Sequence, residues 1–253
     1  MSEQLFPTFS QKLPWITTDQ MIEVDRLMIE VYHIELIQMM ENAGRCLAIL
    51  AKDRFLNGQT TGRVTILAGN GGNGGGALVA ARRLSGWGFD VSIYVTNADK
   101  MKPIPGHQLS ILKNMGLTIH TADDLFQDLN TDLIIDGIIG YSLQGSPRGA
   151  SLQMMNWANN QAAPILSLDA PSGVDLTTGK IYDATIRATS TMTLALPKIG
   201  LADKKVQAYR GELFLADISV PVQLYHEPTL NMEVPFIFRD RDIVKLGGVF
   251  EHR

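Results

Sequence analysis

The chain has 253 residues, of which 45% are hydrophobic and 19% charged, with a formal net charge of −4 at pH 7. This composition is typical of a globular protein, and the acidic balance without a Lys/Arg cluster argues against nucleic acid as a partner. No apolar run approaches the roughly 20 residues that span a bilayer and no leader pattern opens the chain, so we expect no membrane partner and a cytoplasmic location, with organellar import left open.

The length predicts a single domain over residues 1–253. Residues 1–15 are expected to be a loose arm. Thr17 and Gln20 then form a capping-box pattern, in which each side chain satisfies a backbone N–H at the start of a helix. Apolar residues recur at helical spacing to Val31, and a second apolar stripe starts at Leu36. The sequence therefore predicts two helices before the first strand.

From Val64 onward, short apolar runs alternate with stretches long enough for helices. The runs are VTILA, VSIYV, LIID, ILSLD and TMTLAL, and such runs suit strands that are buried on both faces. Helices are expected at 77–84, 106–115 and 151–159. GELFLADI predicts a last strand, whereas the prolines that follow predict an irregular tail over 222–253. The alternation predicts an α/β fold, with a mostly parallel sheet and helices on both faces.

The densest glycine run, from Gly69 to Gly76, lies between the first predicted strand and a helical stretch. Glycines there let backbone N–H groups face an anion, and the following helix N-terminus adds partial positive charge. We predict a phosphate-binding loop, with a flexible turn as the alternative. The run fits G-x-G-x-x-G, but Asp90 precedes its strand instead of ending it, which argues against a dehydrogenase. No Lys-Ser or Lys-Thr closes the loop, which argues against a P-loop NTPase.

Two aspartates end predicted strands: Asp136 closes LIID, and Asp169 closes ILSLD. The ligand crevice of a doubly wound sheet lies outside the carboxyl ends of its strands, so we expect both carboxylates to converge there with the glycine run. Either residue alone is equally well explained as a helix N-cap or a turn former. Together they favour a functional site, in which a carboxylate serves as acid or base, or holds a cation.

Five sequence blocks, in order, resemble those of the NAD(P)HX epimerase family, whose domain is of the YjeF N-terminal type. The blocks are MMENAG at 39–44, GNGGNGGGALVAARRL at 69–84, DGIIGYSLQGSPRG at 136–149, DAPSGVDLTTG at 169–179 and LPKIGL at 196–201. The resemblance implies a Rossmann-like three-layer sandwich with two leading helices, often paired as a homodimer through that region. It also implies an isomerase of metabolite repair that interconverts the R and S hydrates of NADH and NADPH, NADHX and NADPHX.

The resemblance carries residue roles with it. Asn73, Asp136 and Ser172 match the side chains that surround a bound potassium ion, and Asp136 is the predicted catalytic carboxylate. The segment that contains YSLQG is expected to close over the ligand. The implied substrate contacts are Gly72, Asn73, Gly74, Gly75 and Gly76 in the glycine run, Gly140, Tyr141, Ser142, Leu143, Gln144, Gly145 and Ser146 after LIID, and Asp169.

The glycine run departs from the family pattern Asn-Asn-Gly-Gly-Asp-Gly. Here the corresponding residues run from Gly72 to Ala77, so the first Asn and the loop Asp, at Gly76, are missing. The alternative hypothesis is therefore a catalytically weak or inactive ligand-binding or scaffold protein on the same fold. Elsewhere, Gly44 is expected to support close helix packing, and Lys198 is expected to be a solvated lysine after a strand end.

Overall fold

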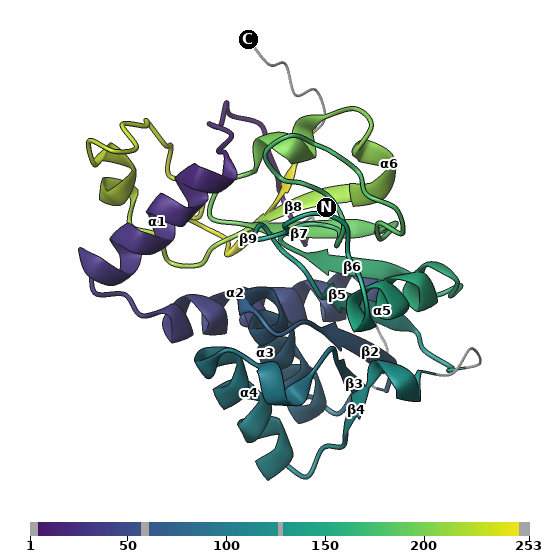
Figure 1. Ribbon diagram of the computed structural model, residues 1–253. Coiled ribbons are helices and arrows are strands. Elements are labelled where there is room, and N and C mark those ends of the chain that lie inside the picture. The colour runs from purple at the N-terminus through teal and green to yellow at the C-terminus, as the bar shows by residue number, and fades with distance from the viewer. Residues whose placement is uncertain (1–4, 57–60, 126–128, 248–253) are drawn as a thin grey trace.

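A computed structural model describes residues 5–56, 61–125 and 129–247 of the protein (Figure 1). Within these residues, nine strands form one sheet, and all neighbouring strands are parallel except β8 and β9. In order across the sheet, the strands are β1 (Thr8–Phe9), β9 (Ile243–Leu246), β8 (Glu212–Ala216), β7 (Ser190–Leu194), β6 (Ile165–Leu168), β5 (Leu133–Gly137), β2 (Arg63–Ala68), β3 (Asp90–Val95) and β4 (Ile119–Thr121).

Helices lie on both faces of this sheet, as Figure 1 shows. The helices are α1 (Thr18–Glu30), α2 (Leu36–Leu50), α3 (Gly72–Gly86), α4 (Pro103–Asn114), α5 (Ala150–Asn159) and α6 (Gln207–Arg210), and a π turn (Ala51–Phe55) extends α2. Short 3-10 turns lie at Ala98–Lys100, Ala122–Asp124, Ile199–Ala202 and Val222–His226. The predicted α/β fold class is confirmed. In the described part of the chain, no helix is both long and apolar enough to cross a membrane.

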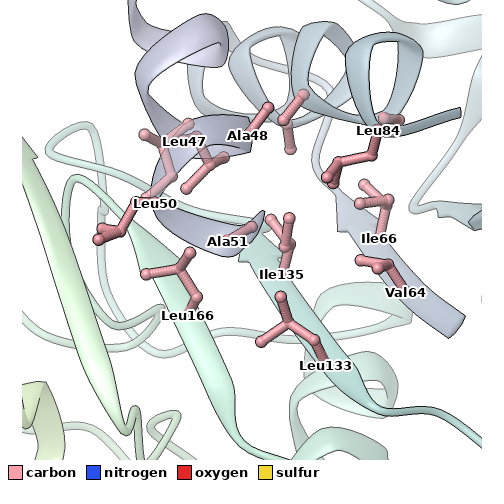
Figure 2. Close-up of a cluster of buried hydrophobic side chains, with 14 of the residues drawn as sticks. Leu47, Ala48, Leu50, Ala51, Val64, Ile66, Leu84, Leu133, Ile135 and Leu166 are labelled. Atoms are coloured by element: carbon pink, nitrogen blue, oxygen red, sulfur yellow. The ribbon is translucent and has the colours of Figure 1, made fainter. Parts of the chain in front are cut away.

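The central strands are buried on both faces. Figure 2 shows Leu133 and Ile135 of β5 beside Leu166 of β6, in a core that also contains Leu50 of α2. Ile134 belongs instead to the core on the other face, which includes residues of α5. Because side chains alternate along a strand, Asp136 follows Ile134 onto the α5 face. This alternation decides the place of Asp136 in the site.

The start of α1 follows the capping-box prediction. The Gln20 backbone N–H donates to Thr17 Oγ1 (3.2 Å), and the Thr17 backbone N–H donates to Gln20 Oε1 (2.9 Å). The chain then leaves the helix at Val31 and re-enters helix at Leu36. The two predicted leading helices are therefore present, with the break where the apolar stripe stops.

Two segments differ from the prediction of a loose arm and an irregular tail. Within 1–15, β1 pairs with β9, and the buried Phe6 ring meets the Phe214 ring edge-on with centroids 5.6 Å apart. Within 222–253, β9 pairs antiparallel with β8. β1 has two residues and β9, which lies between β1 and β8, has four, so both strands are too short for a readable apolar period. The ends of these segments, 1–4 and 248–253, lie outside the described residues.

Candidate functional site

The second part of the glycine run, Gly72 to Gly76, forms the start of α3, and only Gly69 to Gly71 lie in the connection from β2. The helix starts at Gly72 with Gly71 as its N-cap, five residues before the predicted start at Ala77. A Cβ on Gly75 would lie 2.4 Å from Met40 Sδ of α2, and one on Gly74 would lie 1.8 Å from a backbone carbonyl. Glycine is therefore needed at Gly74, where the neighbour is backbone, whereas at Gly75 it lets the end of the Met40 side chain pack directly against the helix. The free N–H groups of the first turn form a partly positive end that suits an anion.

A cavity of about 620 Å³ lies between this end of α3, helices α1 and α2, and the chain that follows β5 and β6. Its volume is in the range of sites for small-molecule ligands. Met39 and Met40 of α2 contribute apolar surface. The expected contact residues that line the cavity are Gly72, Asn73, Gly76, Gly140, Tyr141, Ser142 and Asp169. The structure thus brings residues from all five sequence blocks to one cavity.

The remaining expected contact residues lie elsewhere. Leu143, Gln144, Gly145 and Ser146 line a smaller hollow of about 260 Å³ beside Arg148, together with Ser142, which also borders the main cavity. Among the described residues that line either space, Gly74 and Gly75 do not appear. The segment after β5 therefore spans both spaces, with Ser142 at the boundary.

Asp169 presents a carboxylate to the main cavity through a backbone turn directly after β6. Its φ of 64° is in the left-handed region, which Asp tolerates better than most residues. Oδ1 accepts a hydrogen bond from Lys198 Nζ at 2.6 Å, and Oδ2 accepts one from the backbone N–H of Tyr141 at 3.1 Å. The two oxygens are thereby held in fixed directions, with Oδ2 attached to the segment after β5.

Lys198 is buried, so the prediction of a solvated lysine is wrong. Its side chain has an exposed fraction of 0%, and Nζ also donates to the Leu194 carbonyl (2.8 Å) and Thr193 Oγ1 (3.3 Å). Three oxygen acceptors and the charge of Asp169 compensate the loss of water around the ammonium. The apolar neighbours in LALPKIGL were the available signal for burial.

Asp136 is fully buried behind the cavity and does not line it. Its Oδ1 accepts from Ser172 Oγ (2.6 Å) and the Ile138 N–H (3.2 Å), and its Oδ2 accepts from Ser167 Oγ (2.7 Å) and the Ser172 N–H (2.9 Å). Burial raises the pKa of Asp136, although these hydrogen bonds oppose the shift. None of the four donors carries a charge, so the arrangement suits either a protonated carboxyl or a nearby cation.

Asn73 and Ser172 connect the glycine helix and Asp136 to the segment after β5. Asn73 Nδ2 donates to the Leu168 carbonyl (3.0 Å), and Ser172 Oγ accepts from the Ile139 N–H (2.9 Å). A Cβ on Gly140 would lie 3.0 Å from Asn73 Oδ1 and 3.2 Å from an Asp169 oxygen. A larger residue at this position would require both oxygens to move by a few tenths of an ångström.

Asp25 of α1 is a further carboxyl group of the cavity, one that was not predicted from the sequence. It lines the cavity, and its Oδ2 accepts a hydrogen bond from the Tyr141 hydroxyl (2.5 Å). Burial raises the pKa of Asp25, with the Tyr141 hydrogen bond as the main opposing influence. The sequence could have indicated its place, because Asp25 lies four residues after Met21 and three before Met28 and therefore shares the apolar face of the helix.

The MENAG block supports helix packing as expected. A Cβ on Gly44 of α2 would lie 2.4 Å from Val79 Cβ of α3, so the two helices touch through this glycine. In the same block, Glu41 forms ion pairs with Arg82 and Arg83 of α3. The block therefore fixes α2 against the helix that starts at the cavity.

The parallel sheet, the glycine-rich start of its first crossover helix and the cavity at the carboxyl edge define an α/β ligand-binding protein of the Rossmann-like class. Comparisons with known proteins make the assignment more specific. The family model described as "YjeF-related protein N-terminus" matches residues 36–200, more than half of the chain. The chain belongs to this family.

Two NAD(P)H-hydrate epimerases match the chain over most of their length, and a longer bifunctional enzyme matches it over part of its length. It is 39% identical over 229 residues to an NAD(P)H-hydrate epimerase of Dehalogenimonas lykanthroporepellens, covering 90% of this chain and 91% of the relative. It is 30% identical to an NAD(P)H-hydrate epimerase of Rhodopirellula baltica, covering 85% and 88%. It also matches 41% of a bifunctional NAD(P)H-hydrate repair enzyme of Moorella thermoacetica at 32% identity, over 83% of this chain.

A solved structure supports the fold. The yeast protein ynu0 superposes with a TM-score of 0.79 over 92% of this chain and 100% of that chain, at 22% sequence identity. The similarity shows that both chains share the same arrangement of sheet and helices.

Proposed function

We propose that the protein is an NAD(P)H-hydrate epimerase, an isomerase that interconverts the R and S hydrates of NADH and NADPH. The observation that carries the proposal is the cavity itself, where a fixed Asp169 carboxylate lies in the same space as the N-terminus of α3. Relatives that bear this enzyme name match along about nine tenths of the chain.

The proposed position of the ligand follows from the chemistry of two parts of the cavity, the N-terminus of α3 and the Asp169 carboxylate. The backbone N–H groups at Gly72 and Asn73 suit the phosphates, because a helix N-terminus favours negative charge. Asp169 suits the hydrated ring, whose hydroxyl and carboxamide groups can donate hydrogen bonds to a carboxylate. Residues of the Gly140–Ser146 segment would then cover the ligand between these ends, since Tyr141 and Ser142 line the cavity.

We also propose that Asn73, Asp136 and Ser172 hold a potassium ion. The donor set fits, because all three offer oxygen atoms, and hard monovalent and divalent cations prefer oxygen ligands to sulfur or nitrogen. Asp136 fits in particular, since it is a buried carboxyl whose four hydrogen-bond donors are neutral. When bound, the ion would supply positive charge beside the ligand.

In this proposal Asp136 is catalytically important without facing the cavity. Its contacts run to Ser172, and from there to the backbone of Ile139 in the segment that leads to Gly140. Asp136 would therefore act by holding the cation and fixing this segment. Asp136→Ala is expected to abolish the epimerase activity and its response to potassium, whereas Asp136→Asn should keep more of the fold.

The direct test is epimerisation of purified R-NADPHX, followed by chromatography in potassium and in sodium buffer. Conversion faster than in buffer supports the enzyme, and potassium-dependent conversion supports the cation site. No acceleration by folded protein would support the alternative, a ligand-binding or scaffold protein whose Gly76 lacks the loop carboxylate of the family. Hydride transfer is disfavoured because Asp90 is the first residue of β3, at the opposite edge of the sheet from the glycine helix.

We further propose that the protein forms a homodimer through its leading helices. Ile22 and Val31 of this region have exposed fractions of 51% and 48%, which provides apolar surface for a second copy. Light scattering coupled to size-exclusion chromatography should give twice the chain mass of 27.8 kDa. Ile22→Lys should shift the protein toward monomer, and a monomeric wild type would refute this part of the proposal.

A further inference from the structure

Asp25 gives the cavity a second carboxyl group, which binds the hydroxyl of Tyr141, whereas Asp169 binds the backbone N–H of the same residue. It comes from α1, at the start of the chain, whereas Tyr141 follows β5 and Asp169 follows β6. We propose that Asp25 is a catalytic acid and base of the epimerisation and works as a pair with Asp169. This inference rests on the proposed function and adds a reacting group to it.

Tyr141 connects the two carboxyl groups. Its hydroxyl donates to Asp25 Oδ2 at 2.5 Å, and its backbone N–H donates to Asp169 Oδ2 at 3.1 Å. All three residues line the same cavity. A ligand ring that enters beside Tyr141 therefore meets a carboxyl group from α1 and another from the end of β6.

The two carboxyl groups have different charge environments. Asp169 forms an ion pair with the buried Lys198 ammonium, with Nζ 2.6 Å from Oδ1. The hydrogen-bond partner of Asp25 is instead a neutral phenol. Burial raises the pKa of Asp25, the carboxylate of Asp169 adds to the shift, and the Tyr141 hydrogen bond and the Lys198 charge oppose it. One cavity thus holds a carboxyl group whose burial favours the protonated form and a second carboxyl group that is ion-paired with a buried ammonium, a contrast that suits the division between acid and base.

This pair matches the chemistry of inverting a carbon that carries a hydroxyl group and is bonded to a ring nitrogen. Asp25 gives its proton to the hydroxyl, the C–O bond breaks and water leaves. The nitrogen lone pair forms a C=N bond, and the ionised Asp169 stabilises the resulting positive charge. Water then adds to the opposite face of the carbon, and its surplus proton goes to Asp169. Proton exchange with solvent restores Asp25, so atoms and charge balance and no oxidant is needed.

The two groups exchange roles when the reaction runs from the other epimer. The carboxyl that received the proton in one direction must donate it in the reverse direction, because both directions pass through the same transition states. The connection through Tyr141 keeps the two groups in one arrangement for both directions. This explains why the side chain and the backbone of one residue each bind a different aspartate.

The test compares kcat and KM for R-NADPHX in wild type, Asp25→Asn, Tyr141→Phe and the control Glu30→Gln, which changes an exposed carboxylate on the same helix. Asparagine still accepts the Tyr141 hydrogen bond but cannot act as the acid. Asp25→Asn should lower kcat by about 10²- to 10⁴-fold with little change in KM, the usual range for loss of an acid–base group. Glu30→Gln should behave like wild type.

The pH dependence of kcat/KM distinguishes a catalytic Asp25 from one with a purely structural role, because a structural role would not shift it. The alkaline limb of kcat/KM should disappear in Asp25→Asn. In Tyr141→Phe, that limb should move to higher pH, because the lost hydrogen bond holds the pKa of Asp25 down. A limb that stays in place in Tyr141→Phe overturns the proposal, even where Asp25→Asn does not fold well enough to assay.

Reaction in ¹⁸O-labelled water tests the proposed bond breaking. Each inversion should place solvent oxygen in the product hydroxyl, at a rate above the exchange in buffer without enzyme. Inversion without incorporation of solvent oxygen overturns the step. An Asp25→Asn enzyme whose kcat stays within about threefold of wild type also overturns it, because the expected loss in kcat is much larger. An inactive wild type would instead refute the proposed function, so the two failures are distinguishable.

Discussion

Replacing Lys198 by methionine should destabilise the protein more than any surface lysine change. The side chain has an exposed fraction of 0%, and its Nζ meets Asp169 Oδ1 at 2.6 Å, the Leu194 carbonyl at 2.8 Å and Thr193 Oγ1 at 3.3 Å. Methionine fills a similar volume but leaves the carboxylate buried without its cation. Breaking a buried ion pair from one side costs about 3–5 kcal/mol. That is a large share of the roughly 5–15 kcal/mol by which domains are stable.

Urea unfolding measures this loss as a lower midpoint at unchanged slope. Lys204→Met, at an exposed lysine, is the matched control and should change stability by less than about 0.5 kcal/mol. Adding Asp169→Asn to Lys198→Met removes the unpaired charge and should restore part of the stability. A loss below about 1 kcal/mol for Lys198→Met, or strict additivity in the double mutant, would refute the argument that the two charges compensate each other.

Three further outcomes follow from the packing and the titration behaviour. Gly44→Val should lower the free energy of unfolding by about 1–3 kcal/mol, because its Cβ would lie 2.4 Å from Val79 Cβ; an unchanged melting temperature would contradict this. Burial raises the pKa of Cys46 to about 12, so a thiol reagent at pH 8 should label it in urea and not in the folded protein. The Arg63 side chain lowers the pKa of Asp132, so its stabilisation is present at neutral pH and lost as the pH falls through that lowered value. Asp132→Asn should therefore cost less than about 1 kcal/mol at pH 7 and nothing in strong acid, and a pH-independent difference would count against the ion pair.

Apolar periodicity was sufficient to predict the main elements of the fold. VTILA and LIID became β2 and β5, and the capping box placed the start of α1. The start of α3 was missed because glycine has a low helix propensity. In the structure, Gly75 and Gly76 let α3 pack closely against Met40 of α2 and Leu168 of β6. β1 and β9 were missed because strands of two and four residues are too short to show an apolar period.

The cavity residues that could be predicted are those that lie in the sequence blocks that resemble the family. Asp169, Asn73 and Gly140 come from such blocks and meet in space. Asp25 and Lys198 were not predicted, because their roles depend on partners that local patterns do not identify. Asp25 meets Tyr141 across 116 positions of the chain, and Lys198 meets Asp169 across 29. A charged residue within an apolar stretch is the signal that both share.

The two strand-end aspartates show how backbone conformation divides their roles. Asp136 pairs in register with Ser167, and strict alternation would place Asp169, two residues later, on the same α5 face. The left-handed backbone at Asp169 ends the extended strand and directs its carboxylate to Lys198 and the cavity instead. This conformation is unfavourable for most side chains by roughly 1–2 kcal/mol, and the ion pair offsets it. Asparagine also tolerates the left-handed conformation, so Asp169→Asn should show the effect of the lost charge alone. Asp169→Ala should add the cost of backbone strain to that effect.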